Sequence, residues 1–521
     1  MSIYKLRTNF GTHFKYILLG VAFIFVVGAI FTFAGAPGGG PERKGAEQVV
    51  ATVNGMPITK AEMESQWQQM SEGLREMRST MQIAQQRASL FQSLIESRVT
   101  LATADAMGVT ITKKDINNKR DELVTEYLRQ NRSRVLGKLS TEADKVDPRK
   151  DRTYKSELAK GGMSITLLER QANALITDGQ ISSQLAQEGI QKAIEQKIGK
   201  ITKDDIKDSY NTYQIRQIVM MQGSTPAEQF ETQVKKVASE AKTGDFAALA
   251  KKYSLDPDQG TIRAVRYGMV TPDVWDKIST MKPGQVSGPI GNNQGTYIVK
   301  VESTGSEYPS KLTKKAEDQR REMIKNMRQM QIYWKYNQQV RDNLKVVVTD
   351  PELSGYWHLG LAQQAENEAA AKKQIALARN SFEKAIGLEP NNSFATAMLA
   401  AVLVQQQDTK QATQLLYQFL EGKDSKAVGT DLRIMLGDLL YKADKKDEAL
   451  KQYNKGAEEA GFDVSAHQQI MAKYKEIGKD DLADEQQKWI KDYEEKKRIY
   501  EAQQRGSEKQ APAQPAPQGG E

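Results

Sequence analysis

The spacing of apolar and polar residues divides the chain into four parts. Residues 16–36 are apolar and carry no charge, and residues 48–212 place apolar side chains mainly at helical spacing. Residues 213–303 mix short β-like runs with helices and are rich in Gly, Pro and Asn, and helical spacing returns over residues 351–495. The patterns predict a multidomain protein with one N-terminal transmembrane helix, an α-helical region, a small α+β domain and an all-α domain.

The uncharged run is long enough to cross the roughly 30 Å hydrocarbon core of a bilayer as a helix. Lys5, Arg7 and Lys15 precede it without any Asp or Glu, so the positive-inside rule keeps residues 1–15 in the cytoplasm. We therefore expect a single-pass membrane protein whose bulk is extracytoplasmic. A signal peptide cleaved after Ala34-Gly35-Ala36 and a buried core helix are the alternatives.

Residues 37–47 have the composition of a flexible linker, and the helical region 48–212 follows with clear turn and cap signals. Asn54-Gly55 is a tight-turn pair after a short strand-like run. Thr59, with Glu62 three residues later, has the pattern of a capping box.

A long amphipathic helix is predicted from this cap to about residue 107, where Gly108 ends it. Four methionines lie close to one face of it: Met63, Met70, Met77 and Met81. Such a stripe either packs in a core or, partly exposed, forms an adaptable binding surface. The highly charged residues 118–160 are expected to form long exposed helices or a mobile arm.

Residues 213–303 predict one small α+β domain. A strand around Ile215–Val219 is followed by a charged helix, Gly244 ends that helix, and Tyr297–Val301 forms the closing strand. Residues 304–350 are then expected to form a polar linking helix.

The helical pattern of residues 351–495 repeats. Alanines recur 34, 37 and 34 residues apart, and a large side chain follows three of them by four positions. These alanines are Ala378, Ala412, Ala449 and Ala483, and the large residues are Phe382, Leu416 and Tyr453. The period resembles that of tetratricopeptide repeats, with a non-repeating helical bundle as the alternative. Low-complexity residues 496–521 predict a disordered tail.

Composition excludes several chemistries. The 521 residues include no Cys, which removes thiol nucleophiles, disulfides and Cys-ligated metal sites. His13, His358 and His467 are far apart in sequence, so there is no close-spaced His pair, and we expect neither a metal nor a cofactor. The balance of 74 basic against 66 acidic residues, +8 in all, is not concentrated enough to predict nucleic-acid binding.

The α+β domain resembles the parvulin-type peptidyl-prolyl isomerases. The matching segments are Ile215–Val219, Gly244–Ala250, Tyr253–Asp256, Lys282–Ile290 and Gly295–Val301. The resemblance implies a sheet whose pocket holds a proline ring. In the family the pocket floor also carries two histidines on neighbouring strands and a nearby Asp or Cys.

The two family histidines are missing from this chain. Their positions fall on Gln217 and Tyr297, and the family's acidic loop has shrunk to Gly260-Thr261-Ile262, so no acidic partner is expected. The resemblance thus implies a retained fold without catalytic residues and with lost or greatly weakened activity. The family positions that grip proline fall on Met269, Trp275, Ile278 and Met281. These four residues either line a peptide-binding groove or fill a small core.

The anchor and the helical region resemble the SurA- and PpiD-type periplasmic folding factors, on residues 53–59 and 90–116. The repeats are similar to the tetratricopeptide-repeat domain of YfgM-type membrane proteins. Together these resemblances imply a membrane-anchored chaperone that binds unfolded or nascent secreted and envelope polypeptides, with subunits of the secretion translocon as partners. An active peptidyl-prolyl cis–trans isomerase and a repeat-based scaffold for envelope complexes are the alternatives.

Overall fold

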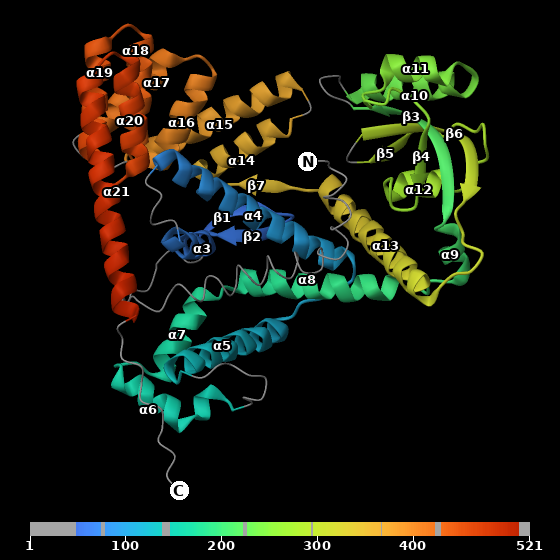
Figure 1. Cartoon of the computed structure of the whole chain (residues 1–521), viewed down its shortest axis with the longest axis horizontal. Coiled ribbons are helices and arrows are strands. Elements are labelled where there is room, and N and C mark those ends of the chain that lie inside the picture. Colours follow the sequence, from blue (N-terminus) through green and yellow to red (C-terminus); the bar gives the residue numbers. More distant parts are fainter. Residues whose placement is uncertain are drawn as a thin grey trace. The chain divides into compact units, whose positions relative to one another are not determined.

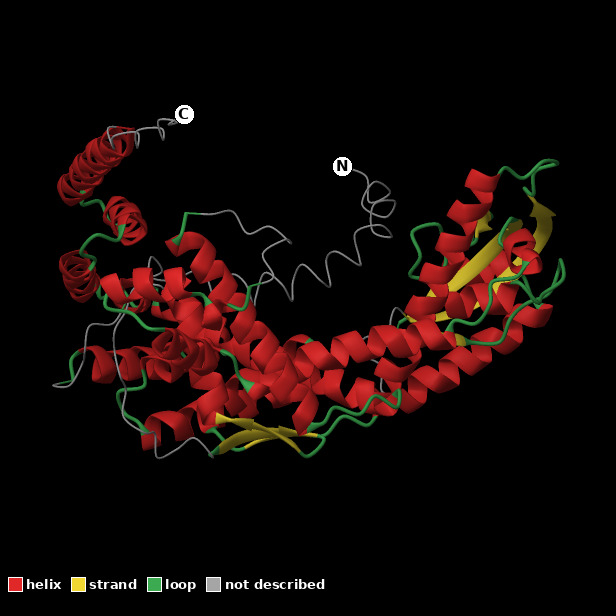
Figure 2. Ribbon diagram, turned by 90° about the horizontal axis from the view of Figure 1, so that it is seen from below, coloured by secondary structure: helices red, strands yellow, loops and turns green. Residues whose placement is uncertain are grey.

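The computed structural model describes residues 48–73, 79–137, 146–221, 227–292, 295–365, 367–422 and 429–509. The described chain is mostly helical (Figure 1) and has two small sheets (Figure 2). It divides into two compact units: unit 1 contains the residues up to 73, 90–349 and 360–374, and unit 2 contains 74–89, 350–359 and the residues from 375 on.

The predicted transmembrane helix at 16–36 lies outside the described residues. Among the helices that the structure describes, none combines the length and the apolar character needed to span a bilayer.

A three-stranded antiparallel sheet opens the described part of unit 1. Its strands are β1 (Val49–Val53), β2 (Met56–Thr59) and β7 (Val346–Val348), in the order β2-β1-β7. Asn54 and Gly55 make the turn between β1 and β2 with φ of 49° and 80°, the left-handed backbone that this pair favours, so the predicted turn is confirmed. β7 lies where the sequence predicted the linking helix, because three residues are too few to show a strand period and their state is set by pairing with β1.

Helices follow this sheet along the chain; they lie in unit 1 except for residues 80–89, which belong to unit 2. They are α3 (Lys60–Gly73), α4 (Thr80–Ala106), α5 (Lys113–Val135), α6 (Arg152–Lys160), α7 (Ile165–Leu175), α8 (Asp178–Lys197) and α9 (Lys203–Asp208), with the 3-10 turn η1 (Pro148–Lys150). The single long helix predicted up to residue 107 is therefore two helices. The Thr59 hydroxyl accepts a hydrogen bond from the Glu62 N–H at 3.2 Å, but the Glu62 carboxylate does not complete the capping box, because it pairs with Arg98 at 2.5 Å.

The charged segment 118–160 is packed where the structure describes it, not an exposed arm. Leu128 on α5 and Tyr154 on α6 are fully buried and share one core with Leu168 on α7. The Tyr154 hydroxyl donates to Asn131 at 2.7 Å. The charges that suggested exposure lie on the outer faces, while a few widely spaced apolar residues are enough to hold α5 to α6 and α7.

The sheet domain (Asn211–Ser306) is the α+β domain of the sequence. Its strands are β3 (Asn211–Met220), β4 (Arg263–Arg266), β5 (Ile290–Asn292) and β6 (Gly295–Ser306), antiparallel in the order β4-β3-β6-β5. Helices α10 (Ala227–Thr243) and α11 (Phe246–Tyr253) cover one face, where Ile218 and Ile298 are buried. Helix α12 (Pro272–Ile278) covers the other, where Ile215 and Val299 are buried. This alternation of buried residues along β3 and β6 gives the sheet two cores.

The long helix α13 (Lys314–Asp342) follows the sheet domain and lies inside the segment predicted as a linking helix. It packs along α8 and α9, and Arg328 pairs with Asp205 at 2.6 Å. Tyr333 and Tyr336 pack against the apolar core between α4 and α8. The helix is thus part of the body of unit 1.

Unit 2 is built from successive helices. They are α14 (Pro351–Gln363), α15 (Glu368–Leu388), α16 (Ser393–Gln405), α17 (Thr409–Leu420), α18 (Thr430–Lys442), α19 (Lys446–Glu459), α20 (Val464–Glu476) and α21 (Asp480–Lys509). Glycines let paired helices approach: a Cβ on Gly437 would lie 2.4 Å from the Tyr453 ring, and one on Gly355 would lie 2.3 Å from the Phe382 ring. Helix α21 continues to Lys509, so the disordered tail predicted from residue 496 is helical over its first part.

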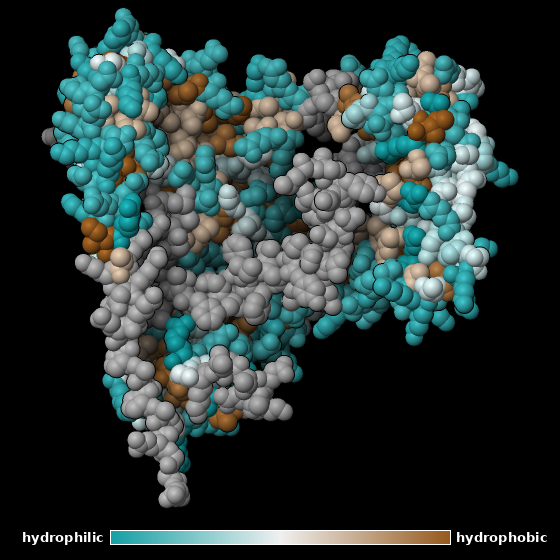
Figure 3. All heavy atoms as spheres, viewed as in Figure 1, coloured by the Kyte–Doolittle hydropathy of each residue, from teal (hydrophilic) through white to brown (hydrophobic). Residues whose placement is uncertain are grey.

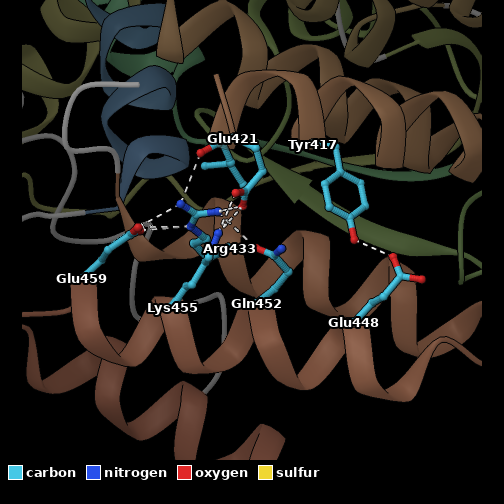
Figure 4. A network of polar contacts seen from close by, with 8 residues as sticks. Tyr417, Glu421, Arg433, Glu448, Gln452, Lys455 and Glu459 are labelled. Atoms are coloured by element: carbon cyan, nitrogen blue, oxygen red, sulfur yellow. Dashed lines mark hydrogen bonds and ion pairs between the residues drawn. The ribbon is translucent and has the colours of Figure 1, made fainter. Parts of the chain in front are cut away.

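A buried arginine joins three helices of unit 2 (Figure 4). Arg433 on α18 donates to Glu421 at the end of α17 at 2.7 Å, and to Glu459 on α19 at 2.9 Å. It also donates to Gln452 at 3.1 Å. Lys455 is a second cation on Glu421, at 2.6 Å. Two carboxylates and two cations therefore balance within one cluster, which makes burial of the guanidinium tolerable.

Candidate functional site

The structure brings together the two positions that the sequence assigned to the family histidines. In the pairing of β3 with β6, Gln217 lies opposite Val299, and Tyr297 lies opposite Val219. Because alternate residues of a strand share a face, Gln217 and Tyr297 lie on the same face of the sheet as diagonal neighbours. This is the face that α12 covers further along.

Gln217 is buried and hydrogen-bonded at both ends of its amide. Its Nε2 donates to the Asp256 carboxylate, and its Oε1 accepts from Arg263 Nη2 at 2.5 Å. Gln217 thus links an anion and a cation. The amide's donor and acceptor are both in use.

The sequence showed no clear acidic counterpart, and the structure places the Asp256 carboxylate against Gln217. Asp256 lies beside Gln217 because the segment after α11 is fixed to the end of β3: the Val219 N–H donates to Ser254 Oγ at 3.0 Å, and the Leu255 N–H donates to the Val219 carbonyl at 2.8 Å. The signal was present in the matching segment Tyr253–Asp256, whose position in space the sequence alone did not reveal. Arg263 was missed too, since it lies in the shortened loop and β4, where the resemblance gives no guide.

Arg263 and Tyr297 are the hydrogen-bond donors next to this amide. Arg263 lies opposite Ile215 in the β3–β4 pairing, and its Nε is buried without a hydrogen-bond acceptor in the described part of the chain. Burial raises the pKa of the half-buried Tyr297 phenol, and the Asp256 charge raises it further while Arg263 opposes this. The phenol therefore stays protonated at neutral pH and can donate a hydrogen bond.

Three of the four predicted proline-gripping residues lie in one core. Trp275, Ile278 and Met281 are 7%, 0% and 9% exposed and pack against Ile215 and Val299. The Trp275 ring makes edge-to-face contacts with Tyr213 and Tyr267, with centroids 5.4 and 5.2 Å apart.

Met269 differs from these three residues. It lies in the turn after β4 and is 37% exposed. A peptide-binding groove formed by all four residues stays a prediction, since the three buried side chains present little surface to a ligand.

The predicted methionine face of the N-terminal helices is divided. Met63 on α3 is buried in the core, Met70 is half-buried, and Met81 lies on the separate helix α4. Met77 lies outside the described residues. Within the described part of the chain, no group of three or more His, Asp or Glu is placed to hold a metal ion.

Comparison with known proteins finds matches to the N-terminal helical region and to the sheet domain. Residues 7–123 match the SurA-like N-terminal domain, and residues 201–314 match the PPIC-type PPIase domain. The foldase protein PrsA 4 of Bacillus cereus is 28% identical over 259 residues, which is 47% of this chain and 85% of that protein. The foldase protein PrsA of a Geobacillus species is 30% identical over 126 residues, 23% of this chain and 43% of that protein.

Solved structures give weaker similarity. The peptidylprolyl isomerase PrsA of Bacillus anthracis is 18% identical and covers 47% of this chain and 95% of its own, with a TM-score of 0.22. Only the sequence matches therefore carry weight. They assign this chain a SurA-like N-terminal domain followed by a parvulin-type PPIC domain, matching the PrsA- and SurA-type foldases.

Proposed function

We propose that this protein is a membrane-anchored extracytoplasmic chaperone that holds unfolded secreted or envelope polypeptides and has little or no isomerase activity. The proposal rests on Gln217 and Tyr297, which stand at the positions that the resemblance assigns to the family histidines, in a domain whose sheet has an apolar core on each face. A domain that keeps its fold without its family's imidazoles is better suited to holding a chain than to turnover.

The hydrogen bonds of Gln217 support weak catalysis. Rotation about an X–Pro bond has a barrier of about 18–20 kcal/mol, and a catalyst lowers it with polar groups that contact the twisted amide. The Gln217 amide is already bonded to Asp256 and Arg263. It would have to leave both partners to contact a substrate, at a cost of about 1 kcal/mol or more for each bond.

The anchor proposal rests on the uncharged residues 16–36 and the basic residues before them. It places the protein in the bacterial inner membrane as a single-pass protein with a cytoplasmic N-terminus, close to the secretion translocon. We expect alkali to leave the full chain in the membrane fraction. Removal of residues 16–36 should release it. Release of the intact chain by alkali would contradict the anchor.

The helices of unit 2 are proposed to be tetratricopeptide-like repeats that dock a partner such as a translocon subunit. The close pairs Gly355–Phe382 and Gly437–Tyr453 support this, because a small residue facing a large one is what packs the two helices of such a unit. Photo-crosslinking from the exposed faces of α17 and α20 in cells tests it. Capture of translocon subunits is expected, whereas capture of envelope assembly proteins alone would favour the scaffold alternative.

Two assays on the full chain test the chaperone proposal. We expect the protein to suppress aggregation of a chemically unfolded client at near-equimolar amounts. It should leave the exchange of a short prolyl peptide close to its uncatalysed time of about 10–100 s. Acceleration by orders of magnitude together with unchanged client aggregation would overturn the proposal.

An active isomerase is the second candidate, and one observation favours it. Arg263 and the protonated Tyr297 phenol are donors on the site face, and the reaction breaks no covalent bond, so well-placed donors can assist it without an imidazole. The prolyl peptide assay separates the two candidates, and loss of activity in Arg263→Met would identify the donor.

A further inference from the structure

Helix α13 carries an apolar stripe on its surface, although its sequence predicts a polar linking helix. The stripe, called here the α13 stripe, consists of Met323, Met327, Met330 and Trp334. Their spacing of four, three and four residues places them on one side of the helix. Met330 is 39% exposed and Trp334 is 43% exposed, while Met323 and Met327 are half-buried.

The stripe is distinct from the residues that hold α13 in unit 1. Ile324 and Val340 are buried, and Tyr333 and Tyr336 pack on the core between α4 and α8. Gln331 donates to Asp276 of the sheet domain at 2.6 Å. The helix is therefore anchored by its other faces, and the exposure of Met330 and Trp334 is not the result of a detached helix.

The stripe continues into the rim of the candidate site. Met323 Sδ lies 4.0 Å from the place where a Cβ on Gly268 would be, and Gly268 immediately precedes Met269. Met269 is the one predicted proline-gripping residue that is exposed. The half-buried Met323 thus lies between the exposed Met269 of the turn after β4 and the exposed Met330 and Trp334 of α13. Hydrophobic residues on the face drawn in Figure 3 occur as small patches among hydrophilic ones.

We propose that the α13 stripe binds an extended, uncharged apolar segment of an unfolded polypeptide, next to the segment held at the sheet domain. From Met323 to Trp334 the helix rises by about 17 Å, the length of about five residues of extended chain. Thioethers and an indole adapt to different apolar side chains, which suits a surface that must accept many sequences.

The charged and polar groups beside the stripe also favour an uncharged segment over a charged one. Amides stand beside the stripe at Asn326, Gln331 and Gln338, of which Gln331 is bonded to Asp276 and Gln338 to Asp342. The arginines near the stripe are already engaged: Arg341 pairs with Glu96, and Arg320 lies over the Tyr210 ring and donates to the Ser209 carbonyl. A charged segment would gain little there and would lose hydration, whereas amide side chains can hydrogen-bond to the main chain of an extended peptide.

This inference deepens the proposed chaperone function and rests on it. The test uses the full chain and a labelled, proline-free peptide with an apolar centre, because proline-free binding does not depend on the prolyl site. We expect Met330→Gln/Trp334→Gln to weaken binding of the peptide about tenfold or more, as expected for loss of a Trp anchor. Replacing the peptide's central apolar residues with Lys should weaken binding to the wild-type chain comparably.

Matched controls separate the stripe from a general loss of apolar surface. Leu388→Gln removes an exposed apolar side chain at the end of α15, and Gln339→Ala changes an exposed residue of α13 outside the stripe. Both should bind the peptide as the wild type does. A photo-reactive residue at position 334 should capture the peptide, and a far-UV spectrum equal to the wild type's should show that the double variant is folded.

The outcomes distinguish the two claims. If the wild type suppresses client aggregation but the double variant still binds the peptide at full strength, the stripe inference is overturned and the chaperone proposal stands. If the wild type neither suppresses aggregation nor binds the peptide, both fail. If the double variant instead converts a dimer to a monomer and leaves peptide binding unchanged, the stripe contacts a second copy of the chain, and the inference is overturned.

Discussion

The side-chain amide of Gln217 donates to the carboxylate of Asp256 across the end of β3, at one of the two positions that the resemblance to parvulins assigns to histidine. Arg263 donates to the other end of the same amide. The polar centre of the site is therefore a hydrogen-bonded series of the Arg263 guanidinium, the Gln217 amide and the Asp256 carboxylate. Its carboxylate remains in the place where it could orient an imidazole.

That arrangement predicts that activity can be restored. In the variant Gln217→His/Tyr297→His, Asp256 should accept from the new imidazole at position 217 and fix its tautomer, as a carboxylate commonly does for histidine. We expect the double variant to shorten exchange of a prolyl peptide at least about tenfold from the uncatalysed 10–100 s. A coupled exchange assay on the full chain measures it.

Gln217→Ala/Tyr297→Phe is the matched control, because it removes the same polar groups without adding imidazole. It should be as slow as the wild type. Equal rates in the histidine variant and this control would show that the missing imidazoles are not what limits the domain.

The sequence predicted the features that depend on neighbouring residues better than those that depend on residues far apart in the chain. The Asn54-Gly55 turn is set by adjacent residues, and the structure has it, whereas the capping box predicted at Thr59 is incomplete because Glu62 pairs with Arg98 from a later helix. The strand β7 could not be foreseen, because Val346–Val348 is a strand only through pairing with β1 nearly 300 residues earlier in the chain. Asp256 was visible in a matching segment, but its contact with Gln217 depends on how that segment crosses the end of β3.

The glycine–aromatic contacts make a prediction about unit 2. A methyl group at Gly437 would meet the Tyr453 ring at 2.4 Å, so Gly437→Ala forces α18 and α19 apart or moves the ring. Overpacking of this kind costs about 1–3 kcal/mol. We expect a lower urea midpoint for the helical signal of unit 2, measured by circular dichroism.

Gly387→Ala is the matched control for Gly437→Ala, because it too replaces a glycine within a helix of unit 2. Nothing lies within 4 Å of a Cβ at Gly387 in α15, and alanine favours a helix over glycine by about 0.5–1 kcal/mol. This variant should be as stable as the wild type or more so. Equal behaviour of the two variants would mean that the Gly437–Tyr453 contact does not set the helix spacing.

The beginning of α4 is capped by a residue 350 positions away, and its loss should be measurable. Asp431 on α18 accepts hydrogen bonds from the N–H of Thr80 at 3.1 Å, the N–H of Met81 at 2.8 Å and the Ser79 hydroxyl at 2.8 Å. Removing a helix cap costs about 1 kcal/mol. Asp431→Ala should therefore speed amide exchange in residues 79–89, as followed by mass spectrometry.

Asp431→Asn keeps one acceptor oxygen and should show a smaller change. Unaltered exchange in Asp431→Ala would indicate that water replaces the carboxylate at no cost. Faster exchange throughout the chain would instead point to general unfolding.

The Arg433 cluster predicts a pH dependence of unit 2. Burial alone would raise the pKa of Glu421, but hydrogen bonds from Lys455 and Arg433 and their positive charges outweigh it and lower the pKa below its usual value. A carboxylate with a lowered pKa in the folded state stabilises that state above the ordinary pKa of about 4.3, and this contribution is lost as the pH falls through the folded-state pKa. Since Arg433 stays charged throughout, acidification leaves a buried cation with fewer anions around it.

Glu421→Gln should therefore lower the urea midpoint of unit 2 relative to the wild type at pH 7 and at pH 5. The difference between the two proteins should shrink as the pH falls below about 4, because the wild-type carboxyl is then protonated as well. The matched control is Glu458→Gln, an exposed neighbour on α19, which should give a small difference at every pH. A Glu421→Gln difference that stays constant down to pH 3 would show that the Glu421 oxygens act as neutral acceptors, and that its charge is not what balances Arg433.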